Sequence, residues 1–151
     1  MEKYAYYKSK IGIIKITYGM KIKRIELVDK LGESEPSKLS DRAFVEISQY
    51  LENKRDNFDI VSDIELKGSD FRIKVWKALL DVPYGETRTY KDIALAIESP
   101  KASRAVGAAI GANPFMIIVP CHRVIRSDGK IGGYEYGSHL KKLLLEMEKG
   151  K

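Results

Sequence analysis

The stretch Tyr90–Ala112 decides the fold; its sequence is YKDIALAIESPKASRAVGAAIGA. Apolar residues at helical spacing predict two short helices, over residues 90–97 and 101–112. Between them, Ser99 is expected to cap the second helix and Pro100 to occupy its first position. Two short helices joined by so brief a connection are typical of a helix-turn-helix.

The second of these helices offers almost no side-chain bulk. Its small residues are Ala102, Ala105, Gly107, Ala108, Ala109 and Gly111. Tight packing against a neighbouring helix is the commoner explanation of such a surface. The alternative is close approach to a DNA groove, with Arg104 as the one long side chain that reaches out.

The N-terminal part alternates in the manner of β-strands. Residues 4–7, 11–18 and 21–28 predict an antiparallel meander, with Gly19-Met20 as a hairpin turn. Residues 39–51 have helical spacing, so one helix is expected to cover the sheet. Residues 58–66 are interpreted as a further strand or an extended connector.

Helical patterns dominate from Ser69 onward. Ser69 is a candidate N-cap for a helix that places Phe71, Val75, Trp76, Leu79 and Leu80 on one face, and residues 140–148 form a closing amphipathic helix. Trp76 is expected in the core and His139 at the surface. We therefore predict an α+β fold with a support domain over residues 1–68 and a mostly helical domain over 69–151.

Charge is unevenly shared between these two parts. The net charge is +6, and residues 69–151 hold 14 basic and 9 acidic side chains against 13 and 12 in residues 1–68. A basic lobe favours polyanion binding, although a merely soluble, lysine-rich surface would have the same composition. No apolar run is long enough to span a membrane, so we expect a cytoplasmic protein without a targeting segment.

The buried run Phe115–Val119, interpreted as a strand, leads into Pro120-Cys121-His122-Arg123-Val124. One cysteine cannot form an internal disulfide, and one cysteine with two histidines is too few for a metal site, so we expect neither metal nor cofactor. A lone cysteine after such a strand is usually a small buried hydrophobe. The basic residues that follow it and the helix-turn-helix upstream favour thiol chemistry on DNA instead.

The Pro120–Val124 motif resembles the active-site signature of the O6-alkylguanine-DNA alkyltransferases. Other segments agree in order and spacing, namely 71–76, 83–87, 89–90, 102–107, 113–114, 132–134 and 144–148. The resemblance covers residues 69–149, whereas the N-terminal part, ribonuclease H-like in that family, agrees mainly in its predicted architecture.

The resemblance implies a single-turnover reaction in which Cys121 takes the alkyl group from O6 of a flipped guanine, with O4 of thymine as a further candidate. It implies that His122 accepts the thiol proton through a water, that Glu148 orients the imidazole, and that Tyr90 donates a hydrogen bond to the departing guanine. Asn113 would hold the junction before the cysteine. The S-alkyl product has no route back to the thiol.

The same resemblance implies a monomer on double-stranded DNA, with the small-residue helix in the minor groove. Arg104 would fill the place of the flipped base, and Ser99, Lys91 and Arg72 would contact phosphates. Tyr134, Met116 and Glu135 would line the alkyl pocket. Met116 and Glu135 differ from common choices in the family, which affects the size of alkyl group that is tolerated.

Three other classes of protein are alternatives to this interpretation. Alkyltransferase-like proteins bind the lesion but lack the nucleophile, so Cys121 argues against that class. A cysteine hydrolase would need an oxyanion hole that the sequence does not indicate. A plain DNA-binding regulator would bind equally well after Cys121→Ser.

Overall fold

The computed structural model describes residues 1–150 and divides into two compact units. The first unit contains residues 1–66 together with 114–118, and the second contains residues 67–113 and the chain from 119 onward. The sequence-based division left 114–118 in the C-terminal part. The structure joins this segment to the first unit, because its backbone bonds to a strand there.

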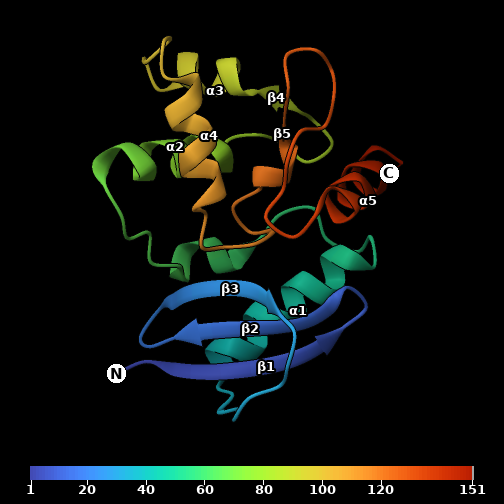
Figure 1. Cartoon of the computed structure of the whole chain (residues 1–151). Coiled ribbons are helices and arrows are strands. Elements are labelled where there is room, and N and C mark those ends of the chain that lie inside the picture. The colour runs from blue at the N-terminus through green and yellow to red at the C-terminus, as the bar shows by residue number, and fades with distance from the viewer. Residues whose placement is uncertain (151) are drawn as a thin grey trace. The chain divides into compact units, whose positions relative to one another are not determined.

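The first unit is built on an antiparallel meander of β1 (Lys3–Ser9), β2 (Gly12–Tyr18) and β3 (Ile22–Val28). Ala5, Ile16 and Ile25 pair across the three strands and are fully buried, as the alternation of the sequence predicted. Helix α1 (Lys38–Leu51) runs across one face of this sheet (Figure 1). Its N-cap is Ser37, which forms a capping box with Ser40.

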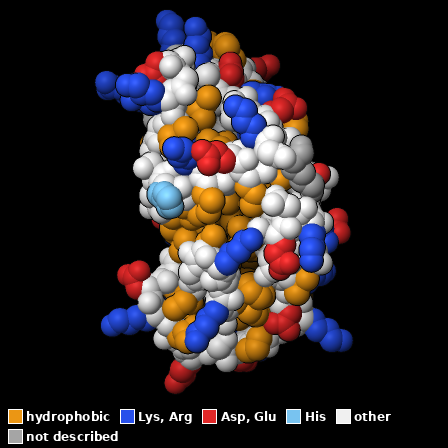
Figure 2. Space-filling view, turned by 90° about the vertical axis from the view of Figure 1, so that its right-hand side faces the viewer, with side chains coloured by type: hydrophobic (Ala, Val, Ile, Leu, Met, Phe, Trp, Pro, Cys, Tyr) orange, Lys and Arg blue, Asp and Glu red, His pale blue; other side chains and the backbone are white. Residues whose placement is uncertain are grey.

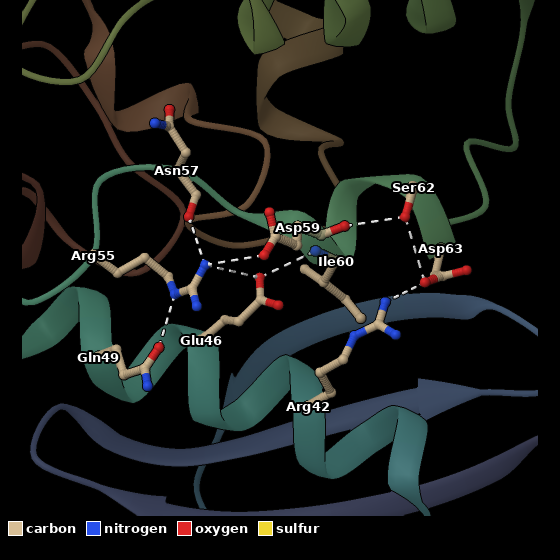
Figure 3. A network of polar contacts seen from close by, with 9 residues as sticks. All are labelled: Arg42, Glu46, Gln49, Arg55, Asn57, Asp59, Ile60, Ser62 and Asp63. Carbon is tan, nitrogen blue, oxygen red and sulfur yellow. Dashed lines mark hydrogen bonds and ion pairs between the residues drawn. The ribbon is translucent and has the colours of Figure 1, made fainter.

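The strand or extended connector expected over residues 58–66 was wrong for Asp59–Asp63, which form the 3₁₀ helix η1, whereas Ile64 is extended and forms a β-bridge with Ile22. Figure 3 shows the polar network that fixes this turn against α1. The buried carboxylate of Glu46 accepts a hydrogen bond from the Ile60 amide at 3.0 Å, and Arg55 Nη1 lies 3.7 Å from Asp59. These long-range contacts draw the segment into a turn.

The strand expected over Phe115–Val119 is also absent beyond a single bridge. Phe115 pairs with Ile25, because the Ile25 amide donates to Pro114 and the Met116 amide donates back to Ile25. Ile117 then has a φ of 72°, which no strand can accommodate. Burial of the segment was predicted correctly, since Phe115 is 0% and Ile118 is 2% exposed.

The second unit groups α2 (Asp70–Leu80), α3 (Tyr90–Ala96) and α4 (Ser103–Gly111) (Figure 1). Ser69 caps α2 as expected, by accepting a hydrogen bond from the Arg72 amide. Trp76 is 2% exposed, and its Nε1 donates to the Ala109 carbonyl at 2.9 Å, whereas His139 is exposed. The packing of α2 against α4 confirms that part of the small-residue surface serves helix contact.

The second helix of the pair begins later than the sequence indicated. Helix α4 starts at Ser103, and its N-cap residue Ala102 makes no side-chain cap bond. Ser99 does not cap this helix; its carbonyl accepts the Ala102 amide at 2.9 Å within a turn. Glu98, with a φ of 60°, bends the chain before Pro100, so Pro100 lies outside the helix.

The remaining elements bring distant segments together. Strands β4 (Arg88–Thr89) and β5 (Val124–Ile125) form a short parallel pair, and η2 (Cys121–Arg123) leads directly into β5. The closing helix is α5 (Ser138–Lys149). Among residues 1–150, no helix is both long and apolar enough to cross a membrane.

Candidate active site

Cys121 lies at the start of η2, where its amide donates to the Val119 carbonyl at 2.8 Å. The residue is only 8% exposed. Burial raises the pKa of the thiol, while a hydrogen bond from the Asn113 side chain and the charge of Lys141 oppose that rise. The free protein therefore holds a thiol whose ionisation depends on the groups around it.

Asn113 lies at the junction where the sequence placed it. Its Nδ2 donates to the Val119 carbonyl at 2.8 Å, and the same side chain hydrogen-bonds Cys121. The residue is 4% exposed. One amide therefore fixes both the backbone before the cysteine and the sulfur itself.

His122 and Glu148 form a buried pair. His122 Nε2 lies 2.7 Å from Glu148 Oε2, and the two residues are 0% and 3% exposed. Since a carboxylate only accepts, Nε2 carries the hydrogen and Nδ1 keeps the lone pair. Burial lowers the pKa of His122 despite the neighbouring carboxylate, so the ring is neutral near pH 7 and can accept a proton.

Arg123 and Gly85 complete the environment of Glu148, and the sequence analysis predicted neither contact. Arg123 donates from Nε to Oε1 at 2.8 Å and from Nη2 to Oε2 at 3.1 Å, while the Gly85 amide reaches Oε1 at 3.1 Å. Arg123 Nη1 also donates to the Val82 carbonyl at 2.8 Å. The guanidinium compensates the carboxylate, so Glu148 can hold the imidazole without requiring it to be charged.

Gly85 adopts a φ of +82°, a conformation that side-chain-bearing residues rarely accept. This geometry turns its amide toward Glu148. The glycine of the Pro83-Tyr84-Gly85 turn, which the sequence analysis placed only in a segment resembling the alkyltransferases, thus lies beside Glu148.

Tyr90 is the first residue of α3 and is half-buried. Its ring faces Gly107 of α4, and its hydroxyl faces Gly132, where the Cβ of any larger residue would lie 3.4 Å from the oxygen. Burial and the nearby Cys121 raise the pKa of the phenol, so it stays protonated and can donate a hydrogen bond. Tyr90 thus lies between a glycine of α4 and a glycine of the segment before α5.

Lys141 is a further site residue that the sequence analysis missed. Its Nζ donates to the Val124 carbonyl at 2.6 Å and to the Gly133 carbonyl at 3.0 Å, and the residue is 1% exposed. Burial lowers its pKa to about 8, and the proximity of Cys121 opposes the shift. The helical spacing of Lys141, Leu144 and Glu148 could have indicated that this lysine is buried, because the three residues share one buried face of α5.

The three residues expected to line an alkyl pocket differ in their burial and in the unit to which they belong. Tyr134 has a buried hydroxyl, and the pKa of its phenol is raised well above the usual value by burial and by Cys121. Glu135 is exposed, yet its charge raises the pKa of Cys121. Met116 is 1% exposed and belongs to the first unit, so its part in the pocket stays a prediction.

The candidate DNA contacts lie on the surface of the second unit. Arg104, Lys91 and Arg72 are exposed, and Ser99 is partly exposed. The outer face of α4 presents Arg104, Ala105, Ala108 and Gly111, whereas Val106 and Ala109 are buried. In the face seen in Figure 2, basic side chains are interspersed with acidic ones and form no continuous patch.

Together, the fold and the site define a helix-turn-helix protein with a buried cysteine followed by a histidine that contacts a buried carboxylate. The family pattern of the 6-O-methylguanine DNA methyltransferase DNA binding domain matches residues 70–150. This chain belongs to that methylated-DNA–protein-cysteine methyltransferase family.

Relatives support this membership over most of the chain. A probable methylated-DNA–protein-cysteine methyltransferase of Acanthamoeba polyphaga mimivirus is 47% identical over 94% of this chain and 93% of its own length. The inducible enzyme of that name from Bacillus subtilis is 55% identical over 70% of this chain, and the match spans only 58% of that relative. A crystal structure of Mycobacterium tuberculosis OGT in complex with DNA superposes with a TM-score of 0.88 at 40% identity, covering 97% of this chain and 92% of the other.

Proposed function

We propose that the protein repairs DNA by transferring an alkyl group, typically methyl, from O6 of guanine to Cys121, once per molecule. The observation that carries the proposal is the His122–Glu148 contact of 2.7 Å beside the cysteine, with Arg123 compensating the carboxylate. The arrangement supplies a neutral base next to a buried thiol. Membership of the methyltransferase family supports the reaction class.

In this reaction the thiol gives its proton to Nδ1 of His122 through a water, and the thiolate attacks the alkyl carbon. The sulfur–carbon bond forms as the carbon–O6 bond breaks, and the electron pair passes to the guanine ring. Glu148 stabilises the positive charge that the imidazole gains, whereas the charge of Arg123 opposes it. Tyr90 donates a hydrogen bond to the departing base, because its raised pKa keeps it protonated.

DNA recognition is assigned to the second unit. The exposed small residues of α4 let the helix backbone approach a minor groove closely, and Arg104 enters the stack that the flipped nucleotide leaves. Lys91, Arg72 and Ser99 contact phosphates. That a relative of TM-score 0.88 was crystallised with DNA supports DNA as the partner.

Tyr134 and Glu135 line the alkyl pocket in this proposal, and the protein acts as a monomer with neither metal nor cofactor. The thioether product is stable, so each molecule reacts once. We also propose a cytoplasmic location, since the chemistry needs Cys121 as a free thiol and a reducing compartment preserves it.

Intact-mass spectrometry after incubation with duplex DNA containing O6-methylguanine tests the proposal. The expected result is a gain of one methylene mass on Cys121, saturating at one group per protein. Cys121→Ser is expected to bind the DNA without gaining mass. Repeated turnover, or modification at another residue, would contradict stoichiometric transfer to this cysteine.

A further inference from the structure

Tyr134 carries a buried hydroxyl with no hydrogen-bond partner within residues 1–150. Buried polar groups are nearly always paired, because leaving one unpaired costs stability. An unpaired hydroxyl in a site that must receive a nucleobase therefore indicates a contact reserved for the substrate.

Backbone hydrogen bonds and a ring contact restrain Tyr134. The Gly137 amide donates to the Tyr134 carbonyl at 3.0 Å, and Lys141 Nζ holds the preceding Gly133 carbonyl at 3.0 Å. The Tyr134 ring also packs edge-on against Tyr136, with centroids 5.7 Å apart. These contacts limit the freedom of the phenol to swing toward solvent.

The hydroxyl lies in the neighbourhood of the sulfur. Burial, and then the electrostatic influence of Cys121, raise the pKa of both Tyr134 and Tyr90, so both phenols stay protonated and lie within electrostatic range of the sulfur. The next residue, Glu135, is an exposed carboxylate, which at neutral pH accepts hydrogen bonds but cannot donate one. Among the side chains of residues 132–135, the hydroxyl of Tyr134 is therefore the available donor.

We propose that the Tyr134 hydroxyl donates a hydrogen bond to O6 of the extruded guanine while the carbon–O6 bond breaks. The inference rests on the proposed function and adds a second phenol to it. Tyr90 donates a hydrogen bond to the guanine ring, and Tyr134 donates one to O6. The alkyl carbon passes from O6 to sulfur, and the electron pair stays on the guanine. The guanine takes up one proton, which balances the proton that the thiol gives to His122.

The test is Tyr134→Phe, which removes only the hydroxyl. Single-turnover transfer from O6-methylguanine duplex DNA is expected to slow about ten-fold or more, as for the loss of a donor to developing charge. The Tm is expected to be equal or higher, because the free protein loses an unpaired buried group. Tyr136→Phe is the matched control, and its transfer rate is expected to stay within about two-fold of wild type.

A second measurement separates an effect on the leaving base from one on the sulfur. Iodoacetamide alkylates Cys121 without a guanine leaving group, so Tyr134→Phe is expected to react with it at the wild-type rate.

Three results would overturn the inference alone: an unchanged transfer rate, equal slowing toward both reagents, or a lowered Tm. If wild type gains no methyl group from the DNA, the proposed function fails and this inference falls with it.

Discussion

Arg123 and His122 share the two oxygens of Glu148, with Arg123 Nε 2.8 Å from Oε1 and His122 Nε2 2.7 Å from Oε2. Two adjacent residues of η2 thus converge on one carboxylate of α5. The arginine neutralises that carboxylate, and its charge lowers the pKa of His122. The base strength of the imidazole therefore depends on a residue that is not itself in the proton path.

Replacing Arg123 by methionine is expected to lower the unfolding free energy by about 3–5 kcal/mol, because Glu148 would be left buried without its compensating charge. The pKa of His122 is expected to rise, so the acid limb of the transfer rate moves to higher pH. Urea unfolding and a pH–rate profile measure the two effects. Arg88→Met is the control, since its exposed pair with Glu86 is worth less than about 1 kcal/mol. An unshifted acid limb in Arg123→Met would refute the electrostatic role.

Because the pKa of His122 is lowered in the folded protein, the unfolding free energy is expected to depend on pH in the acid range. The unfolded histidine binds its proton near ~6.5, and the folded one only at lower pH. Between those values the unfolded state holds more protons, so the unfolding free energy falls as the pH drops below about 6.5. Urea unfolding between pH 7 and about 5 is expected to show a smaller slope for His122→Gln. His139→Gln, at the exposed histidine, should retain the wild-type slope; equal slopes in all three proteins would contradict the assignment.

Lys141 is expected to make the unfolding free energy depend on pH in the alkaline range. Its folded pKa is about 8, below the ordinary value of 10.5. From about pH 8 toward 10 the folded state loses this proton first, so the contribution of Lys141 to the unfolding free energy rises with pH. The difference between wild type and Lys141→Met should therefore grow in favour of wild type across that window. Lys142→Met, at an exposed neighbour on α5, should show no such trend. If Lys141→Met shows no trend either, the buried amine does not titrate between pH 8 and about 10.

The sequence correctly predicted those features that depend on residues close together in the chain. The alternation that buries Ile16 and Ile25, the Ser69 cap and the burial of Trp76 depend on spacing within one segment, and the structure has all of them. The late start of α4 was missed because Glu98 adopts a positive φ, which is uncommon for a residue other than glycine.

The parts of the site that escaped prediction depend on contacts between distant segments. Gly85 donates to a carboxylate 63 residues away, and no local pattern encodes that partner. Lys141 was hidden because a lysine in an amphipathic helix is expected to face solvent. It is buried here because two carbonyl groups from other segments accept its hydrogen bonds.

The outer face of α4 provides a test of DNA recognition that leaves the thiol chemistry untouched. Ala108 is exposed on this face, so Ala108→Leu is expected to change the unfolding free energy by less than about 0.5 kcal/mol. A leucine there would hold the helix backbone away from the groove, and the affinity for duplex DNA is expected to fall about ten-fold or more. Iodoacetamide alkylation of Cys121 should proceed at the wild-type rate, because the nucleophile and its base are unchanged.

Ala96→Leu is the matched control for Ala108→Leu, since Ala96 is an exposed helical alanine at the end of α3. Fluorescence anisotropy with labelled duplex DNA would measure both variants. Unchanged affinity in Ala108→Leu would remove α4 from the DNA interface, and equal losses in both variants would show that added bulk acts nonspecifically. A loss confined to Ala108→Leu would mean that the small residues facing solvent serve DNA, while those facing Trp76 serve the packing of α2 against α4.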